Sequence, residues 1–275
     1  MQWTDILILI ALGLGIAIVT TMSGVGGGVF FVPVLIYLEG LQITVAREIS
    51  QFAILGTSLV GSITYLRQKR VNVRVGLIAA AFSVAGVLVY KYFFAFLSNA
   101  IVTLVFALFL LFLAVYYITP ILYNYFKKRN SPPQAMTGEV PTSAAVSMGE
   151  MPSPQGVKWV LKAALLFFVG GFVAAMLGVG GGIIFVPTLS TILDFPIHFA
   201  TATSSFTIVF NAITNVLVAG FRGQIDYVLG SALIVGAMPG AYIGAKYSRK
   251  VPKDPLKCVI AAVMCAVGIL MLTGV

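Results

Sequence analysis

The sequence predicts an all-α protein that crosses a membrane several times and consists of two inverted repeats of about five helical segments each. Three observations predict this fold class: an apolar composition, a series of long apolar runs, and a motif that occurs twice. Of the 275 residues, 60% are hydrophobic and 9% are charged, whereas soluble domains average about 45–50% and about 25%. A soluble fold of this length could not bury so much apolar surface, so the chain is expected to lie in lipid.

Apolar runs follow one another along the chain in two similar series. They lie at 5–22, 29–38, 44–66, 75–97 and 99–126, and again at 159–177, 183–193, 197–221, 227–245 and 256–274. Most approach the roughly 17–25 residues that a membrane-spanning helix needs. The runs Val29–Leu38 and Ile183–Leu193 are shorter, and each follows a glycine cluster and contains a proline. Short interrupted segments at corresponding places in two halves are typical of transporter binding sites.

The internal repeat is the strongest organisational signal. GVGGGVFFVPVL at Gly24–Leu35 recurs as GVGGGIIFVPTL at Gly178–Leu189, an offset of 154 residues. The same offset aligns further pairs without a gap: Ser50 with Ser204, Gly76 with Gly230, and Gly86 with Gly240. The sequence therefore predicts a first repeat over residues 1–126 and a second over 158–275. The Pro-, Ser- and Gly-rich stretch 127–157 is interpreted as a linker outside the membrane.

The positions of basic residues predict how the two halves are oriented. If each half contributes five segments, fourteen of the 17 lysines and arginines fall on one side. Only Arg47, Lys91 and Arg222 then fall on the other side. If the short segments do not cross, the split becomes ten against seven. Lysine and arginine concentrate on the cytoplasmic side, so the first solution predicts inverted halves in the cell membrane, a cytoplasmic linker and both termini outside.

The two glycine clusters are the candidate substrate site. The residues are Ser23, Gly24, Gly26, Gly27 and Gly28, with Gly178, Gly180, Gly181 and Gly182 in the second half. A helix of ten to fourteen residues covers about 15–21 Å, less than the roughly 30 Å hydrocarbon core, so each glycine turn must lie at membrane depth. The helix that follows begins with free N–H groups, which bind anions without a buried lysine or arginine. The alternative is that the glycines only allow close helix packing.

Polar residues on the next helix of each half extend this candidate site. They are Ser50 and Gln51 in the first half and Ser204, Ser205 and Asn211 in the second. Ser204, Thr207, Asn211 and Thr214 or Asn215 follow helical spacing, so they share a face that should turn away from lipid. Taken singly, each side chain is more typical of a helix–helix hydrogen bond. Taken together beside the glycine turns, they favour a pathway for an oxyanion.

Two prolines and two acids leave alternatives open. Pro33 and Pro187 each lie five residues after the last glycine, where proline removes a backbone donor and creates either a fixed kink or a hinge. Glu48 and Asp226 are the acidic residues closest to membrane depth. Intramembrane acids often belong to proton relays. Both lie near helix ends, so we expect solvated helix caps.

The paired GVGGG and Val-Pro motifs resemble the sulfite exporter TauE/SafE family of membrane transporters. The resemblance extends over the chain outside the linker and includes Ala200–Ser205 and Gly223–Asp226. It implies transport of a small sulfur-containing anion, such as sulfite or a sulfonate, across the cytoplasmic membrane. The first half departs from the family pattern at Ala46–Gln51 and Arg70–Asn72, which leaves the substrate open.

Other functions are less consistent with the sequence. The net charge is +9, and the basic residues lie between apolar runs, as residues that set membrane topology do. Nucleic acid is therefore not an expected partner. The chain offers no catalytic constellation and no metal-ligand set around its single histidine, His198, so we expect neither an enzyme nor a cofactor. The expected partners are a small anion and the lipid bilayer, and a homo-oligomer stays open. A membrane scaffold and a passive anion channel are the alternatives to an alternating-access transporter.

Overall fold

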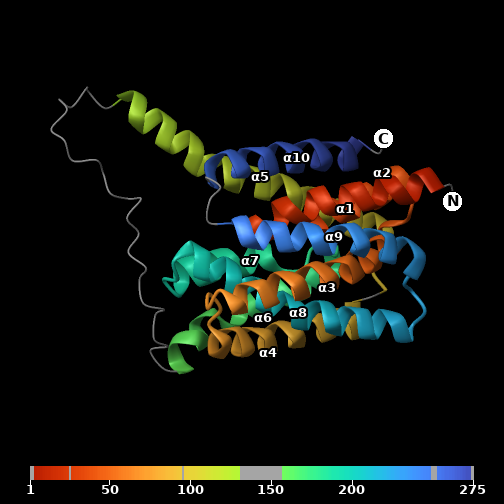
Figure 1. Cartoon of the computed structure of the whole chain (residues 1–275), viewed down its shortest axis with the longest axis horizontal. Helices are drawn as coiled ribbons and strands as arrows, with labels where there is room; N and C mark the ends of the chain where they lie inside the picture. The colour runs from red at the N-terminus through yellow and green to blue at the C-terminus, as the bar shows by residue number, and fades with distance from the viewer. Residues whose placement is uncertain (1–2, 25, 95, 131–156, 249–252, 274–275) are drawn as a thin grey trace.

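The computed structural model describes residues 3–24, 26–94, 96–130, 157–248 and 253–273. All regular structure among these residues is helical, which confirms the predicted all-α class (Figure 1). The expected linker at 127–157 falls almost entirely on residues 131–156, which lie outside the described part of the chain. The first four residues of that stretch continue a helix to Asn130, and Val157 begins the next helix.

Each half contributes a similar succession of helices. In the first half these are α1 (Trp3–Ser23), α2 (Gly28–Glu39), α3 (Ile43–Arg67), α4 (Val73–Val89) with the π-helical turn η1 (Tyr90–Phe94), and α5 (Asn99–Asn130). In the second half they are α6 (Val157–Leu177), α7 (Gly182–Pro187) with the π-helical turn η2 (Thr188–Ile192), α8 (Ile197–Phe221), α9 (Tyr227–Tyr247) and α10 (Lys253–Thr273). The short segments predicted after the glycine clusters are therefore α2 and α7 with η2.

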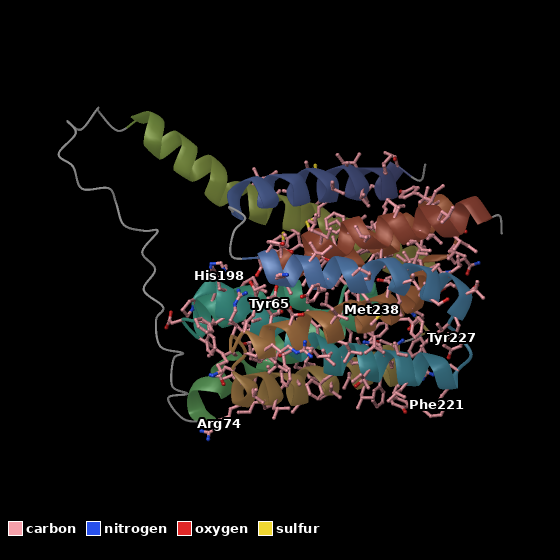
Figure 2. The ribbon with its side chains drawn as sticks, viewed as in Figure 1. Tyr65, Arg74, His198, Phe221, Tyr227 and Met238 are labelled. Carbon is pink, nitrogen blue, oxygen red and sulfur yellow. The ribbon has the colours of Figure 1, made fainter. Side chains whose placement is uncertain are left out.

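The outer surface of the helix bundle is apolar. Phe221, Phe96 and Leu165 expose 90%, 82% and 70% of their surface, and Figure 2 shows Phe221 at the periphery. Among the described residues, 5 helical segments are long and apolar enough to span a membrane, and several shorter apolar helices accompany them. Water would not tolerate this surface, whereas lipid tails solvate it. The chain is a polytopic membrane protein.

The helix contacts repeat when the two halves are exchanged. Helix α1 packs on α9 as its equivalent α6 packs on α4, and α3 packs on α9 as α8 packs on α4. The remaining large contacts join equivalent helices to each other: α3 with α8, and α5 with α10. Each half therefore completes the packing of the other, and neither half is a separate bundle.

The directions of the helices follow from residues in contact. Helices α4 and α8 run parallel. Near their starts the Asn72 N–H donates to the Thr203 hydroxyl, and near their ends Arg222 donates to the Lys91 carbonyl. Because the short turn after Arg67 reverses the chain, α3 runs antiparallel to α4 and hence to α8. Figure 2 shows Arg74 and His198 at one end of the bundle. The end of α5 and the start of α6 lie at the same end, which we call the linker end. The start of α1 and the end of α10 lie at the other, the termini end (Figure 1).

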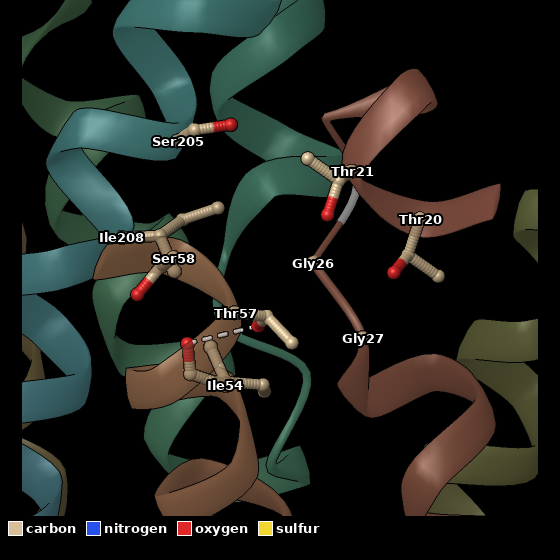
Figure 3. A pocket seen from close by; sticks show the side chains of 9 residues that line it. All are labelled: Thr20, Thr21, Gly26, Gly27, Ile54, Thr57, Ser58, Ser205 and Ile208. Carbon is tan, nitrogen blue, oxygen red and sulfur yellow. Dashed lines mark hydrogen bonds between the residues drawn. The ribbon is translucent and has the colours of Figure 1, made fainter. Parts of the chain in front are cut away.

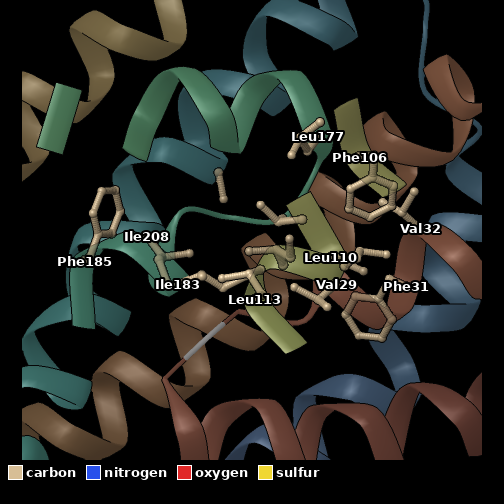
Figure 4. Close-up of a cluster of buried hydrophobic side chains, with 14 of the residues drawn as sticks. Val29, Phe31, Val32, Phe106, Leu110, Leu113, Leu177, Ile183, Phe185 and Ile208 are labelled. Carbon is tan, nitrogen blue, oxygen red and sulfur yellow. The ribbon is translucent and has the colours of Figure 1, made fainter. Parts of the chain in front are cut away.

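The two half-length helices begin near the centre of the bundle. Helix α2 has 12 residues, so it spans about 18 Å, and it leads to the start of α3 at the termini end. Helix α7 leads to the start of α8 at the linker end, so the two diverge. Figure 4 shows their side chains packed together around α5, with Phe31 of α2, Phe185 of α7 and Phe106 of α5 fully buried. This apolar packing fixes the glycine turns that precede both helices.

Candidate functional site

The two glycine turns have matching backbone conformations. Positive φ angles occur at equivalent residues: 71° at Gly24 and 74° at Gly178, then 87° at Gly26 and 82° at Gly180. Side-chain-bearing residues rarely adopt this region, so glycine is required at these positions. The turns differ at the next position, where Gly27 is right-handed and Gly181 has φ 85°.

The turns touch each other directly. A Cβ atom added to Gly26 would lie 2.8 Å from the carbonyl oxygen of Val179, and one added to Gly28 would collide with the Gly178 carbonyl. Close packing, which was the alternative explanation for the glycines, therefore occurs at these residues. It also brings the starts of α2 and α7 together at the centre of the protein.

Two equivalent serines hold the turns in place. The Ser50 hydroxyl on α3 donates to the carbonyl oxygen of Gly178 at 2.9 Å, and the Ser204 hydroxyl on α8 donates to that of Gly24 at 3.3 Å. Both serines are fully buried. These predicted site residues therefore position the turns, each from the opposite half of the chain.

A small cavity with a mixed polar and apolar lining lies beside the first turn (Figure 3). It is lined by the glycine segment, by hydroxyl-bearing residues and by two isoleucines: Gly26, Gly27, Thr20, Thr21, Thr57, Ser58, Ser205, Ile54 and Ile208. Its volume of about 20 Å³ suffices for one water molecule, so a four-atom oxyanion would need its walls to move apart. Figure 3 shows the hydroxyls of Thr21 and Ser205 turned toward this space.

The backbone adds positive potential to this cavity. Helix α2 begins at Gly28, directly after Gly27 in the cavity wall. The first N–H groups of a helix have no carbonyl partner within it, and the helix dipole is positive at this end. Hydroxyls can donate hydrogen bonds as well as accept them. The hydroxyls of Thr20, Thr57, Ser58 and Ser205 donate to carbonyl oxygens of their own helices, so each must rotate to donate to a ligand. With that rotation, the cavity combines neutral donors with a favourable dipole, which suits a small anion.

The residues equivalent to Ser205 and Thr57 of the cavity, Gln51 and Asn211, carry amides. Gln51 donates to the carbonyl oxygen of Ala174 at 2.6 Å, and Asn211 donates to the Ser83 hydroxyl at 2.7 Å. The side-chain oxygen of each amide is buried without a hydrogen-bond partner. A half-turn of either amide exchanges this oxygen for its NH₂ group. These two predicted residues thus keep unused hydrogen-bonding capacity near the protein centre.

The shared polar face of α8 is buried as predicted. Ser204, Thr207, Asn211 and Asn215 are fully buried, whereas Thr214 is half-buried. Thr207 and Asn211 face α4, where Thr207 donates to the Gly76 carbonyl. The face therefore turns away from lipid, but only its first part adjoins the glycine turns.

Other expected residues lie at the edge of the site. The Ser23 hydroxyl donates to the Thr20 carbonyl in the last turn of α1, away from the cavity wall. Pro33 lies within a continuous α2, whereas Pro187 ends α7 and the chain continues as the π-helical turn η2. Thr20 and Thr21 line the cavity but were missed. Two adjacent threonines directly before a glycine turn were the available signal.

The expectation of a solvated cap is correct for Asp226 and wrong for Glu48. Asp226 is exposed and caps α9 by accepting from the N–H groups of Val228 and Leu229 at 2.9 and 3.2 Å. Glu48 is only 2% exposed, and both its oxygens accept from Lys91 Nζ at 2.6 Å. The first turn of α3 is covered by η1, so a carboxylate near a helix end is buried here.

Comparison with known proteins places the chain in a family. The sequence model of "Sulfite exporter TauE/SafE" matches residues 9–271, nearly the whole chain. The chain belongs to the sulfite exporter TauE/SafE family. The two glycine turns that meet at the centre of this TauE/SafE protein contain its paired GVGGG motifs.

Similar proteins carry the names of transporters. The chain is 25% identical to "Probable membrane transporter protein YunE" of Bacillus subtilis over 271 residues, 95% of each protein. It is 25% identical to "Probable membrane transporter protein YdhB" of the same organism, over 97% of this chain and 98% of that one. It is 22% identical to "Probable membrane transporter protein MJ0441" of Methanocaldococcus jannaschii, over 96% and 94%. No solved structure matches the chain. The chain is thus a member of a family of membrane transporters, and its relatives are not named as enzymes.

Proposed function

We propose that this protein carries a small sulfur-containing oxyanion, such as sulfite or a sulfonate, across the cell membrane by alternating access. The observation that carries the proposal is the central cavity, in which five hydroxyl-bearing residues meet a glycine turn and the start of α2. Neutral donors suit a carrier because they bind an oxyanion without trapping it as a buried lysine would. The family description supports sulfite as the first substrate to test.

We propose that the two halves have inverted orientations in the membrane, with the linker in the cytoplasm and both termini outside. The antiparallel course of α3 and α8 supports this orientation, because these helices are equivalent in the two repeats. The three basic residues expected on the outer side also support it. Arg47, Lys91 and Arg222 gather at the termini end, where Arg222 donates to the Lys91 carbonyl.

Access to the cavity would alternate as the halves move against each other. The cavity volume of about 20 Å³ means that its walls must separate to admit an oxyanion. The Gly-rich contact between the turns allows sliding, and Pro187 with the π-helical turn after it offers a hinge in α7, since proline leaves a helix carbonyl without its partner.

Uptake into proteoliposomes tests this function. Purified protein in vesicles loaded with unlabelled sulfite should accumulate radiolabelled sulfite transiently, because a carrier exchanges one substrate molecule for another. Uptake should saturate and should be inhibited by sulfonates. Linear, unsaturable flux without counterflow would indicate a channel. No flux of sulfite, sulfonates or other oxyanions under any gradient would favour a scaffold.

A further inference from the structure

A buried ion cluster lies beside the second glycine turn. Lys91 Nζ is 2.6 Å from Glu48 Oε2, and Arg47 Nε is 3.3 Å from Glu48 Oε1. The three side chains are 1%, 2% and 6% exposed for Lys91, Glu48 and Arg47. Burying ions in a protein interior is unfavourable unless they are paired, and ionisable residues within apolar helices of membrane proteins usually have a function.

The charges in this cluster do not balance. Two buried cations face one carboxylate, and no other described carboxylate forms an ion pair with either cation. Arg222 adds positive charge nearby, since its guanidinium donates to the Lys91 carbonyl oxygen at 3.0 Å. A buried excess of positive charge is unfavourable by itself and favours binding of a further anion.

The cluster is present in one half of the repeat only. At the offset of 154, Arg47, Glu48 and Lys91 correspond to Thr201, Ala202 and Ala245. The π-helical turn η1 that carries Lys91 also has no counterpart, because α9 continues as a regular helix to Tyr247. π-helical turns within helices are frequent at functional sites. Since the second half packs without these ions, the fold does not require them.

The cluster is joined directly to the second turn. Arg47 Nη1 donates to the carbonyl oxygen of Met176 at 3.3 Å, and a Cβ atom at Gly178 would lie 2.7 Å from Arg47 Cβ. Arg47 also donates to the Tyr90 hydroxyl. A ligand of Arg47 would therefore lie near the second glycine turn, on the termini side of the protein centre.

We propose that Arg47 and Lys91 form an anion-binding site at the termini end of the transport pathway, and that the Glu48 carboxylate occupies this site when no substrate is present. The ligand class is a small oxyanion that can accept hydrogen bonds from an ammonium and a guanidinium together. The inference rests on the proposed transport function and adds a second site to it. Competition with Glu48 keeps the anion from binding too tightly to be released.

Anion binding to purified protein in detergent tests the proposal. Sulfite and sulfate would be titrated calorimetrically into wild type, into Glu48→Gln, and into Glu39→Gln as the control. Glu39 is a carboxylate at the same end that forms no ion pair among the described residues. Glu48→Gln should bind sulfite about tenfold more tightly than wild type or more, because the competing charge is gone. Glu39→Gln should bind as wild type does.

The double variant Glu48→Gln with Lys91→Met keeps the test decisive if the single variant does not fold. Of the three buried charges, it retains only that of Arg47. Its affinity for sulfite should therefore be at least about tenfold lower than that of wild type. Unchanged or weaker binding by folded Glu48→Gln, or wild-type binding by the double variant, overturns the proposal. Sulfite uptake without this gain would refute the second site alone, whereas the gain without any uptake would refute the transport function alone.

Discussion

The Ser50 hydroxyl donates a hydrogen bond to the carbonyl oxygen of Gly178, 2.9 Å away in the opposite half of the chain. Its equivalent in the other direction joins Ser204 to Gly24. A second equivalent pair lies farther out, where Gln68 donates to the Ala245 carbonyl and Arg222 to the Lys91 carbonyl. The halves therefore support each other's turns through matched contacts, which couples any movement of one turn to the helix that holds it.

Removing the serine hydroxyls should destabilise the turns unequally. Ser50→Ala leaves a buried carbonyl without its donor, which costs about 1 kcal/mol, and should lower the melting temperature in detergent. Ser204→Ala should have a smaller effect because its bond is longer, 3.3 Å against 2.9 Å. Ser231→Ala serves as the control, since that exposed hydroxyl donates only within its own helix. Equal melting temperatures for all three variants would refute the supporting role of Ser50.

A methyl group at Gly28 should disrupt the contact between the turns. Gly28→Ala places a Cβ atom against the Gly178 carbonyl and 2.6 Å from Val179 Cα, so overpacking should cost about 1–3 kcal/mol. Gly15→Ala is the matched control, because nothing lies within 4 Å of the added atom, and alanine in a helix gains up to about 1 kcal/mol. Thermal unfolding and sulfite uptake measure both effects. A fully active, stable Gly28→Ala protein would show that the turns do not need close contact.

Cysteine labelling tests the inverted orientation. With Cys258 and Cys265 replaced by alanine, single cysteines at Lys69 and Tyr247 should react with a membrane-impermeant maleimide from one face, the cytoplasmic one. A cysteine at Gln224 should react from the opposite face. All three positions are exposed. Labelling of the first two from opposite faces would contradict the inverted arrangement.

Much of the fold could be predicted because the length of an apolar run and the position of a glycine cluster determine where a helix begins and ends. The half-length helices were expected from Val29–Leu38 and Ile183–Leu193, and the structure gives them as Gly28–Glu39 and Gly182–Ile192. Their position at the centre followed from comparing helix length with membrane thickness.

Tertiary contacts explain what the sequence left open. Position near a helix end made Glu48 look solvated, but η1 and α3 together bury it with Lys91. The sequence also could not separate the roles of Ser50 and Ser205, because both are serines on the helix that follows a glycine turn. Only the structure distinguishes Ser50, whose hydroxyl is used by the Gly178 carbonyl, from Ser205, which lines the cavity.

The most direct test of the central cavity compares two threonines of α3. Thr57 lines the cavity and Thr64 does not, yet both are buried and both donate to a carbonyl of their own helix, at 3.0 and 2.8 Å. Initial rates of sulfite uptake into proteoliposomes would be measured for Thr57→Val and Thr64→Val. To donate to the anion, the Thr57 hydroxyl must turn away from the Ile54 carbonyl. Because a net hydrogen bond is worth about 1 kcal/mol, the rate should fall about fivefold or more for Thr57→Val and stay near wild type for Thr64→Val. Equal rates for the two variants would contradict passage of the anion through this cavity.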